Sequence, residues 1–365
     1  MGWSIALIHE AEACEGVKVL VLTDCPSPYQ VELFNEIEAQ GKCSLEVAYL
    51  RGHDPQRQWS APDIRHSSME LSNGGMMRVR ESARRADLVV FNYYLHAKAE
   101  RLIDERARQG GPWCFWGERP GAHQPLWVGR LVRKWKLAKL HSSPAPIWGI
   151  GEFGVDGYRK EFGPRRAYFN LPYFSDLKRF EAIEREEKRE RVFLFSGSLI
   201  ARKGVDLLAS AFVRLNVANV RLRIVGNGPL RESLMQKLAP VKERVEFVGF
   251  KDWQELPREY AAADVLCVPS RYDGWGLVIP EGLAAGLPVI ATDRMGAALE
   301  FVQTGRNGWL IRADDEDALL RAMREAAMNE LPKGARESVR EHTLENGADR
   351  FGRYAQDAMS KWGLS

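Results

Sequence analysis

Two carboxylates stand eight positions apart in residues 264–291, the stretch with the clearest chemical pattern in the chain. Asp273 lies in a glycine-bearing loop after an apolar run, and Glu281 follows Pro280, which predicts the start of a short helix. The helix macrodipole favours a carboxylate in its first turn, so we expect Glu281 to be ionised. The backbone of residues 274–276 lies between the acids and can offer N–H groups to an anion. A ligand that is anionic in one part and rich in hydroxyls in another, such as a nucleotide sugar, fits this pattern.

A second chemical pattern occupies residues 195–212, with the sequence FSGSLIARKGVDLLASAF. A glycine turn at 197–198 ends an apolar strand, and Arg202 and Lys203 follow it just before Gly204. Glycine lets the backbone approach a phosphate, and the two cations neutralise its charge. The alternative is a solvated helix start, but cations oppose the macrodipole there and have no stabilising role. The pattern therefore indicates a phosphate-binding pair, although it is not a P-loop, since GxxxxGK[ST] is absent.

The composition is typical of a soluble globular protein, with 45% hydrophobic and 28% charged residues. A net charge of +3 is too small to indicate a nucleic-acid partner. The five cysteines lack metal-ligand spacing, so we expect reduced thiols in a cytoplasmic protein. No run approaches the ~20 apolar residues of a transmembrane helix. The N-terminus carries acids and no basic region, and is therefore a poor signal peptide.

Apolar strands and amphipathic helices alternate twice along the chain, which predicts two doubly wound parallel sheets. Residues 51–75 have no clean period and are expected to form a long loop. A last amphipathic helix is expected over 336–362. The predicted units are a first Rossmann-like domain (1–175), a linker (176–191), a second such domain (192–335) and a C-terminal helix returning to the first domain (336–365). Two units of this kind place a ligand cleft between the carboxyl ends of their sheets.

The sequence PSRYDGWGLVIPEGLAAGLPVIAT, residues 269–292, resembles the E-x7-E motif of the retaining glycosyltransferases of family 4, also called glycosyl transferases group 1. Asp273 replaces the first Glu and keeps the charge on a shorter side chain. The resemblance implies a GT-B fold, with two Rossmann-like domains facing a central cleft. It also implies retaining, metal-independent transfer of a sugar from a nucleoside-diphosphate sugar to a glycan or lipid-linked glycan, in surface polysaccharide biosynthesis. No cofactor is expected beyond the donor substrate.

The same resemblance implies roles for single residues. Arg202 and Lys203 would stabilise the leaving diphosphate, Glu281 would bind the ribose, and Asp273 would contact the transferred sugar. The turn at 226–228 and the strand end at 249–251 would line the nucleotide pocket, although an ordinary turn and strand end are the alternatives. For Trp275, a buried aromatic is the alternative to ligand contact. The expected donor-binding residues are Gly197, Ser198, Arg202, Lys203, Gly226, Asn227, Gly249, Phe250, Lys251, Asp273, Gly274, Trp275, Gly276, Leu277 and Glu281.

The acceptor is expected to meet loops of the first domain. Residues 115–127 end a strand, and Glu118 and His123 are candidates for the polar group that related enzymes supply to the reacting sugar. A capping carboxylate and a surface histidine are the alternatives. Pro28 and Tyr29 could face the cleft from the first βα loop, where family members often carry a Gly-Gly pair. The expected catalytic residues are Arg202, Lys203, Asp273, Glu118 and His123, and no metal ligands are expected.

Residues 126–140 place Trp127, Leu131 and Trp135 at helical spacing, with basic residues and no acids between them. One interpretation is an interfacial helix that makes peripheral contact with anionic lipid at the inner face of the membrane. The other is an amphipathic surface helix packed on its own sheet. Two other functions stay open: a non-catalytic regulatory protein that binds nucleotide sugars, and a sugar-nucleotide epimerase of the GT-B type. The base, the sugar and the acceptor are not specified by the sequence.

Overall fold

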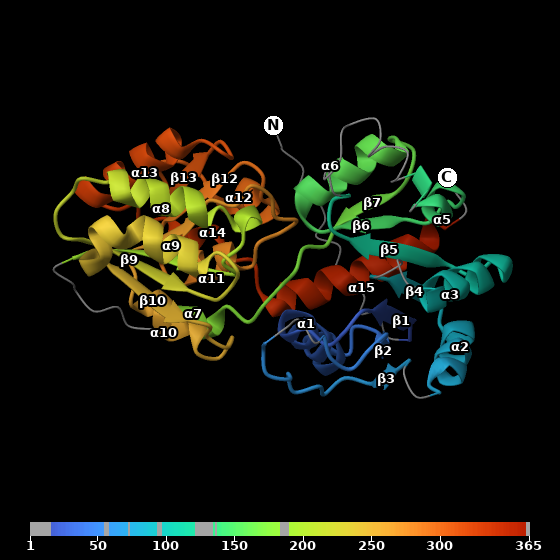
Figure 1. Ribbon diagram of the computed structural model, residues 1–365. Coiled ribbons are helices and arrows are strands. Elements are labelled where there is room, and N and C mark those ends of the chain that lie inside the picture. The colour runs from blue at the N-terminus through green and yellow to red at the C-terminus, as the bar shows by residue number, and fades with distance from the viewer. Residues whose placement is uncertain are drawn as a thin grey trace, which may run out of the picture.

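The computed structural model describes residues 16–54, 58–71, 74–92, 97–120, 134–135, 137–182 and 190–362. These residues form two parallel β-sheets, each covered by helices, that stand side by side (Figure 1). The α/β, doubly wound architecture expected from the alternating pattern is confirmed.

The first sheet has seven strands in the order β3-β2-β1-β4-β5-β6-β7. Its strands are apolar because both faces are covered, and all four residues of β4 are buried. The order reverses between β1 and β4, and loops at such a reversal form a crevice at the carboxyl ends of the strands. The strands are β1 (Lys18–Thr23), β2 (Ser44–Tyr49), β3 (Ser68–Glu70), β4 (Leu88–Phe91), β5 (Trp113–Gly117), β6 (Ile147–Gly149) and β7 (Tyr168–Asn170). The helices are α1 (Pro28–Gln40), α2 (Met76–Arg85), α3 (Ala97–Arg108), α5 (Ala138–His141) and α6 (Gly151–Phe162).

The second sheet has six strands in the order β10-β9-β8-β11-β12-β13, so β8 and β11 flank its own reversal point. Its strands are β8 (Arg191–Ser196), β9 (Val220–Val225), β10 (Val245–Gly249), β11 (Val265–Val268), β12 (Val289–Thr292) and β13 (Gly308–Ile311). Its helices are α7 (Lys178–Glu181), the 3-10 turn η1 (Ala201–Lys203), α8 (Val205–Arg214), α9 (Arg231–Leu238), the 3-10 segment η2 (Ala239–Arg244), α10 (Leu256–Ala261), α11 (Val278–Ala284), α12 (Gly296–Phe301), α13 (Glu316–Met328) and α14 (Ala335–Ser338).

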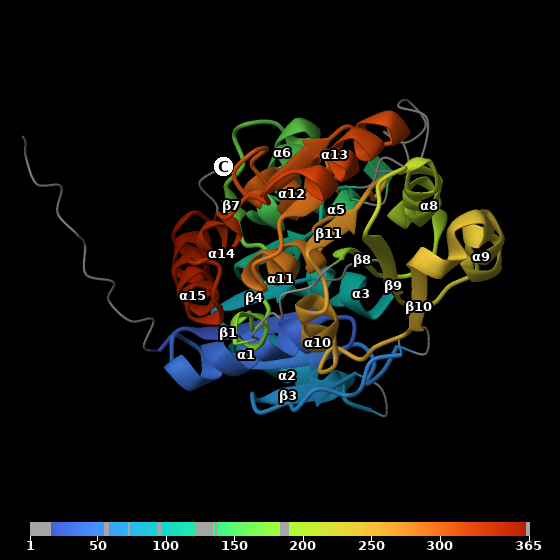
Figure 2. The same ribbon diagram turned by 90° about the vertical axis from the view of Figure 1, so that its left-hand side faces the viewer.

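The last helix, α15 (Leu344–Ser360), leaves the second sheet and lies along α1 of the first half, as Figures 1 and 2 show. The prediction of a single helix over 336–362 is wrong, because α14 and α15 are two separate helices. The side chain of Thr343 caps α15 by accepting a hydrogen bond from the Asn346 N–H at 3.2 Å.

The expectation of a loop throughout residues 51–75 is also wrong, since β3 lies within it and pairs with β2. Buried His66 anchors this segment: its ring nitrogens lie 2.9 Å from the Tyr49 hydroxyl and 2.8 Å from Oδ1 of Asn35. Burial lowers the pKa of His66 to about 4, so the imidazole is neutral. Helix α2, which the sequence pattern does not predict, follows β3 along the chain.

The short helix of the acidic motif begins at Val278 and not at Pro280. Proline is tolerated anywhere in the first turn, where the backbone N–H groups have no partner within the helix. No disulfide forms among the described cysteines, all of which are buried. None of the helices in the described ranges has the length and apolar character needed to span a bilayer.

Candidate functional site

A cleft of about 350 Å³ lies between the two halves. Loops of both sheets line this cleft. The alternation of strands and helices in the sequence predicts a ligand site at this position. From the first half come Pro28, Tyr29, Glu32, Trp59, Glu118 and Tyr173. From α7 and the second half come Arg179, Lys203, Phe250, Lys251, Trp253, Asp273, Gly276, Leu277 and Glu281, among others.

Asp273 forms ion pairs with both predicted phosphate-binding cations, Lys203 and Arg202. Its Oδ2 bonds Nζ of Lys203, and its Oδ1 lies 3.6 Å from Nη1 of Arg202. Gly204 has a φ of +68°, and a Cβ there would lie 1.9 Å from the carbonyl oxygen of Pro269, so only glycine fits. This tight turn delivers both cations to the loop after β11, in an arrangement that can receive a diphosphate.

Glu281 lines the cleft from α11, and its Oε2 accepts a hydrogen bond from the Tyr260 hydroxyl at 3.1 Å. Burial raises the pKa of Glu281 to about 7, although the Tyr260 hydrogen bond and the charge of Arg179 oppose the rise. The predicted ionisation of Glu281 is therefore incomplete near neutral pH. Desolvation outweighs the dipole of a seven-residue helix.

Glu118 reaches across the cleft to the acidic loop. A Cβ on Gly274 would lie 2.0 Å from Oε2 of Glu118, so this carboxylate rests against the backbone of the other half. Nearby, the Tyr272 hydroxyl donates to the Arg119 carbonyl at 3.2 Å. Burial, assisted by the negative charge of Glu118, raises the pKa of Tyr272 to about 12. Glu118 thus lies at the end of the cleft that holds Asp273 and Lys203.

The other predicted residues fall into two groups. Pro28, Tyr29, Phe250, Lys251, Gly276 and Leu277 line the cleft, as does Trp275, whose indole is only 1% exposed and packs on Phe301. The second group is absent from the cleft wall in the described part of the chain: Gly197, Ser198, Arg202, Gly226, Asn227, Gly249 and Gly274. Gly226 packs against the carbonyl of Gly197, which holds the loops after β8 and β9 together. His123 lies outside the described residues.

Sequence reasoning missed several residues of the cleft, above all Glu32 and Arg179. An ion pair joins Nη2 of Arg179 to Oε1 of Glu32, and the guanidinium lies 4.8 Å from the ring centre of Trp253. Arg179 lies in residues 176–191, which the sequence pattern predicts to be a linker. Its neighbour Phe180, which packs against Tyr260, was the available signal that this segment is not fully solvated.

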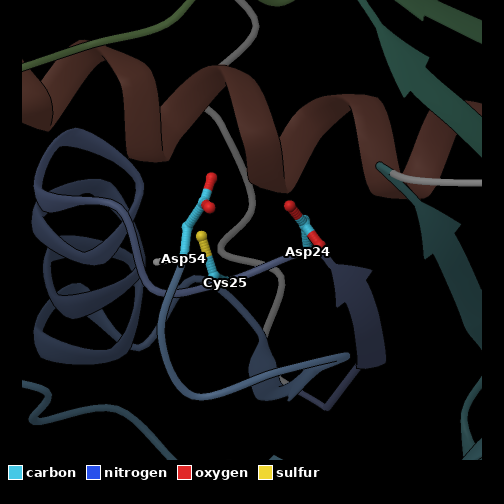
Figure 3. Close-up of side chains that lie close together, drawn as sticks. All are labelled: Asp24, Cys25 and Asp54. Carbon is cyan, nitrogen blue, oxygen red and sulfur yellow. The ribbon is translucent and has the colours of Figure 1, made fainter. Parts of the chain in front are cut away.

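Asp24, Cys25 and Asp54 lie close together beyond β1 (Figure 3). Their ligand atoms are within 4.8 Å of one another. The guanidinium of Arg51 lies 2.6 Å from Asp24 Oδ2 and 3.4 Å from Asp54 Oδ2, so a cation of the protein already balances these carboxylates. The group is not part of the cleft wall in the described residues, and we assign it no metal.

Most of the basic segment 126–140 lies outside the described residues. Within it, Trp135 is 78% exposed, while Leu137 and Leu140 are buried. Lys139 bonds Asp104 of α3 at 2.5 Å. The described end of this segment therefore packs on the first half, and one large aromatic faces solvent.

Two parallel sheets facing a cleft, with paired cations and acids at their junction, define a glycosyltransferase of the GT-B class. The model of the family "Glycosyl transferases group 1" matches residues 190–329. A GDP-mannose-dependent alpha-(1-6)-phosphatidylinositol monomannoside mannosyltransferase of Mycobacterium tuberculosis is 30% identical over 284 residues, covering 72% of this chain and 73% of that protein. Its Mycolicibacterium smegmatis counterpart is 31% identical over 242 residues, covering 61% and 63%.

A solved structure shares the fold. The sucrose-phosphate synthase of Thermosynechococcus elongatus superposes with a TM-score of 0.73 at 21% identity, over 94% of this chain and 99% of that one. The chain belongs to the glycosyl transferases group 1 family and is a glycosyltransferase.

Proposed function

We propose that the protein transfers a hexose from a nucleoside-diphosphate hexose to a hydroxyl group of a glycan or lipid-linked glycan, in the assembly of a surface polysaccharide or glycolipid. The observation that carries this proposal is the ion pairing of Asp273 with Lys203, both of which line the cleft near Glu118, and with Arg202 just outside the cleft wall. The relatives named above are GDP-mannose-dependent mannosyltransferases that act on a phosphatidylinositol mannoside. GDP-mannose is therefore the first donor to test.

The proposed reaction retains the anomeric configuration and needs no metal. The acceptor oxygen attacks the anomeric carbon from the side of the departing diphosphate, and the bond from that carbon to the phosphate oxygen breaks. The acceptor proton passes to the departing phosphate oxygen. Lys203 and Arg202 stabilise the charge that develops on the diphosphate, which is the electrostatic role that a divalent metal has in other transferases. Glu118 and Asp273 orient the reacting sugars, and the meeting of the two halves excludes water.

We expect calorimetry with UDP, GDP and ADP to show one nucleotide binding in the micromolar range, with an affinity that EDTA leaves unchanged. The cation pair supplies the charge that the diphosphate requires, so chelation removes nothing from the site. The corresponding nucleotide sugar is then incubated with an alkyl glycoside, and the anomeric configuration of the product is measured by NMR. Failure of all three nucleotides to bind contradicts the proposed site. A product of inverted configuration contradicts the retaining mechanism alone.

A peripheral contact with anionic lipid through residues 126–140 is part of the proposal, and exposed Trp135 supports it. We expect the protein to float with vesicles that contain anionic phospholipid, and to do so less when Trp135→Ala and Lys134→Glu are combined. A matched variant, Met328→Ala, removes an equally exposed apolar side chain from the second half and should float like the parent. Equal flotation of all three proteins, or none in the parent, contradicts the lipid contact.

A further inference from the structure

One carboxylate joins the two halves at one end of the cleft. The two oxygens of Asp252 accept a hydrogen bond from the Ser60 N–H, at 3.1 and 3.3 Å. The same Oδ1 accepts one from the Trp253 N–H at 2.8 Å. Trp59 and Trp253 are thereby brought to the two sides of Asp252, and both line the cleft. This places an aromatic side chain of the first half at the wall that follows β10.

The wall around Asp252 is suited to a flat, partly polar ring. Phe250 lines it and is 41% exposed, and Lys251 stands next to it. The guanidinium of Arg179 already covers Trp253. Phe250 and Trp59 both line the cleft and so present aromatic surface to a ligand there, and Lys251, whose Nζ lies 3.2 Å from Oε1 of Glu255, adds a hydrogen-bond donor at the same wall.

Three buried polar atoms belong to residues that line the cleft or adjoin a residue that does. Ser60 Oγ, Ser175 Oγ and Trp253 Nε1 are buried and have no hydrogen-bond partner within the described part of the chain. Buried polar groups are nearly always hydrogen-bonded, and those beside a cleft can be satisfied by a polar ligand that enters it. Trp59 differs from fully buried Trp113, Trp116 and Trp148, because part of its surface is open.

We propose that Trp59 is a donor-binding residue, contributed by the acceptor half, that stacks on the nucleobase of the donor opposite Phe250. Asp252 is the positioning residue, because it fixes the backbone of Ser60 and so holds the Trp59 side chain in the cleft. The base is then bound by both halves, and a bound donor draws them together. This inference rests on the proposed function, since it assigns the base end of the same donor site.

The test separates the base from the diphosphate. Binding of the preferred nucleoside diphosphate and of inorganic pyrophosphate is measured by calorimetry for the parent, Trp59→Ala and Trp59→Phe. Because base–aromatic stacking is lost, we expect Trp59→Ala to weaken the nucleotide about tenfold and to leave pyrophosphate unchanged. Trp59→Phe keeps a ring and should restore most of the affinity. Met235→Ala, which removes an exposed apolar side chain of α9 outside the cleft, is the control.

Asp252→Ala provides a second, independent variant in case Trp59→Ala does not fold. It should weaken nucleotide binding and, again, not pyrophosphate binding. Equal loss for both probes, or no loss for either, overturns the inference while the proposed donor site stands. If the parent binds pyrophosphate but none of UDP, GDP and ADP, both the inference and the proposed function fail.

Discussion

Replacing Lys203 with alanine should reduce kcat for sugar transfer by about 10²–10³-fold, because the charge that develops on the departing diphosphate loses its half-buried cationic partner. The Nζ of Lys203 bonds Asp273, and its side chain is only 20% exposed. Arg202 is 41% exposed and lies farther from Asp273, so Arg202→Ala should cost less. Single-turnover kinetics with the preferred nucleotide sugar measure the effect on chemistry apart from product release.

The matched control for this prediction is Lys333→Ala, which removes a lysine that is 84% exposed and lies far along the chain from the cleft. It should leave transfer unchanged. Lys203→Arg keeps the charge with a different shape and should recover part of the rate. If Lys203→Ala and the double variant with Arg202→Ala both keep the kcat of the parent, these two residues do not stabilise the departing diphosphate.

Donor affinity should rise as the pH increases from 6 to 8, and Glu281→Gln should abolish that rise. The pKa of Glu281 is raised to about 7, so the group passes from acid to carboxylate over this interval. A carboxylate accepts hydrogen bonds from both hydroxyls of a ribose, whereas the protonated acid accepts less well. Calorimetric titration of the nucleoside diphosphate at a series of pH values measures the dependence. The groups that also act on Glu281 are Tyr260, Arg179 and Glu32.

The raised pKa of Glu281 also predicts that folding stability changes with pH in the direction opposite to donor affinity. Between the ordinary carboxyl pKa of 4.5 and about 7, the folded state binds more protons than the unfolded state. Stability therefore falls as the pH rises through this window, and Glu281→Gln should raise the melting temperature at pH 8 but hardly at pH 4.5. Glu330→Gln, at an exposed acid, is the control. An unchanged pH dependence of binding in Glu281→Gln would show that another group is titrating.

Much of the fold and the centre of the site could be predicted because their signals are local. Continuous apolar runs mark strands covered on both faces, and β4 and β11 are such runs. Arg202, Lys203 and Asp273 stand directly after strands of the second sheet, and parallel strands bring their carboxyl ends together. The boundaries of helices were less predictable. Pro280 indicates a helix start but is equally compatible with the third position of a helix, which it occupies.

The rest of the site could not be predicted, because its residues are joined only by the meeting of the two halves. Glu118 and Gly274 are far apart in sequence, as are Ser60 and Asp252, and no periodicity relates them. Trp59 lies in a polar segment that reads as a loop. The raised pKa of Glu281 depends on the side chains that surround it, and a motif does not specify them.

The position of α15 against the first half affects the order in which the two halves fold during synthesis. The ring centre of Phe351 in α15 lies 5.3 Å from that of Trp148 in the middle of β6, and Gly347 fits closely against Phe174 and Leu33. The first half thus depends on a helix that leaves the ribosome after the whole second half. Domains of nascent chains usually fold in the order of their translation. In this protein the second half can fold before the first half is complete. Until α15 is synthesised, the apolar surface of the first half that α15 covers stays exposed. A chaperone would be needed at that stage.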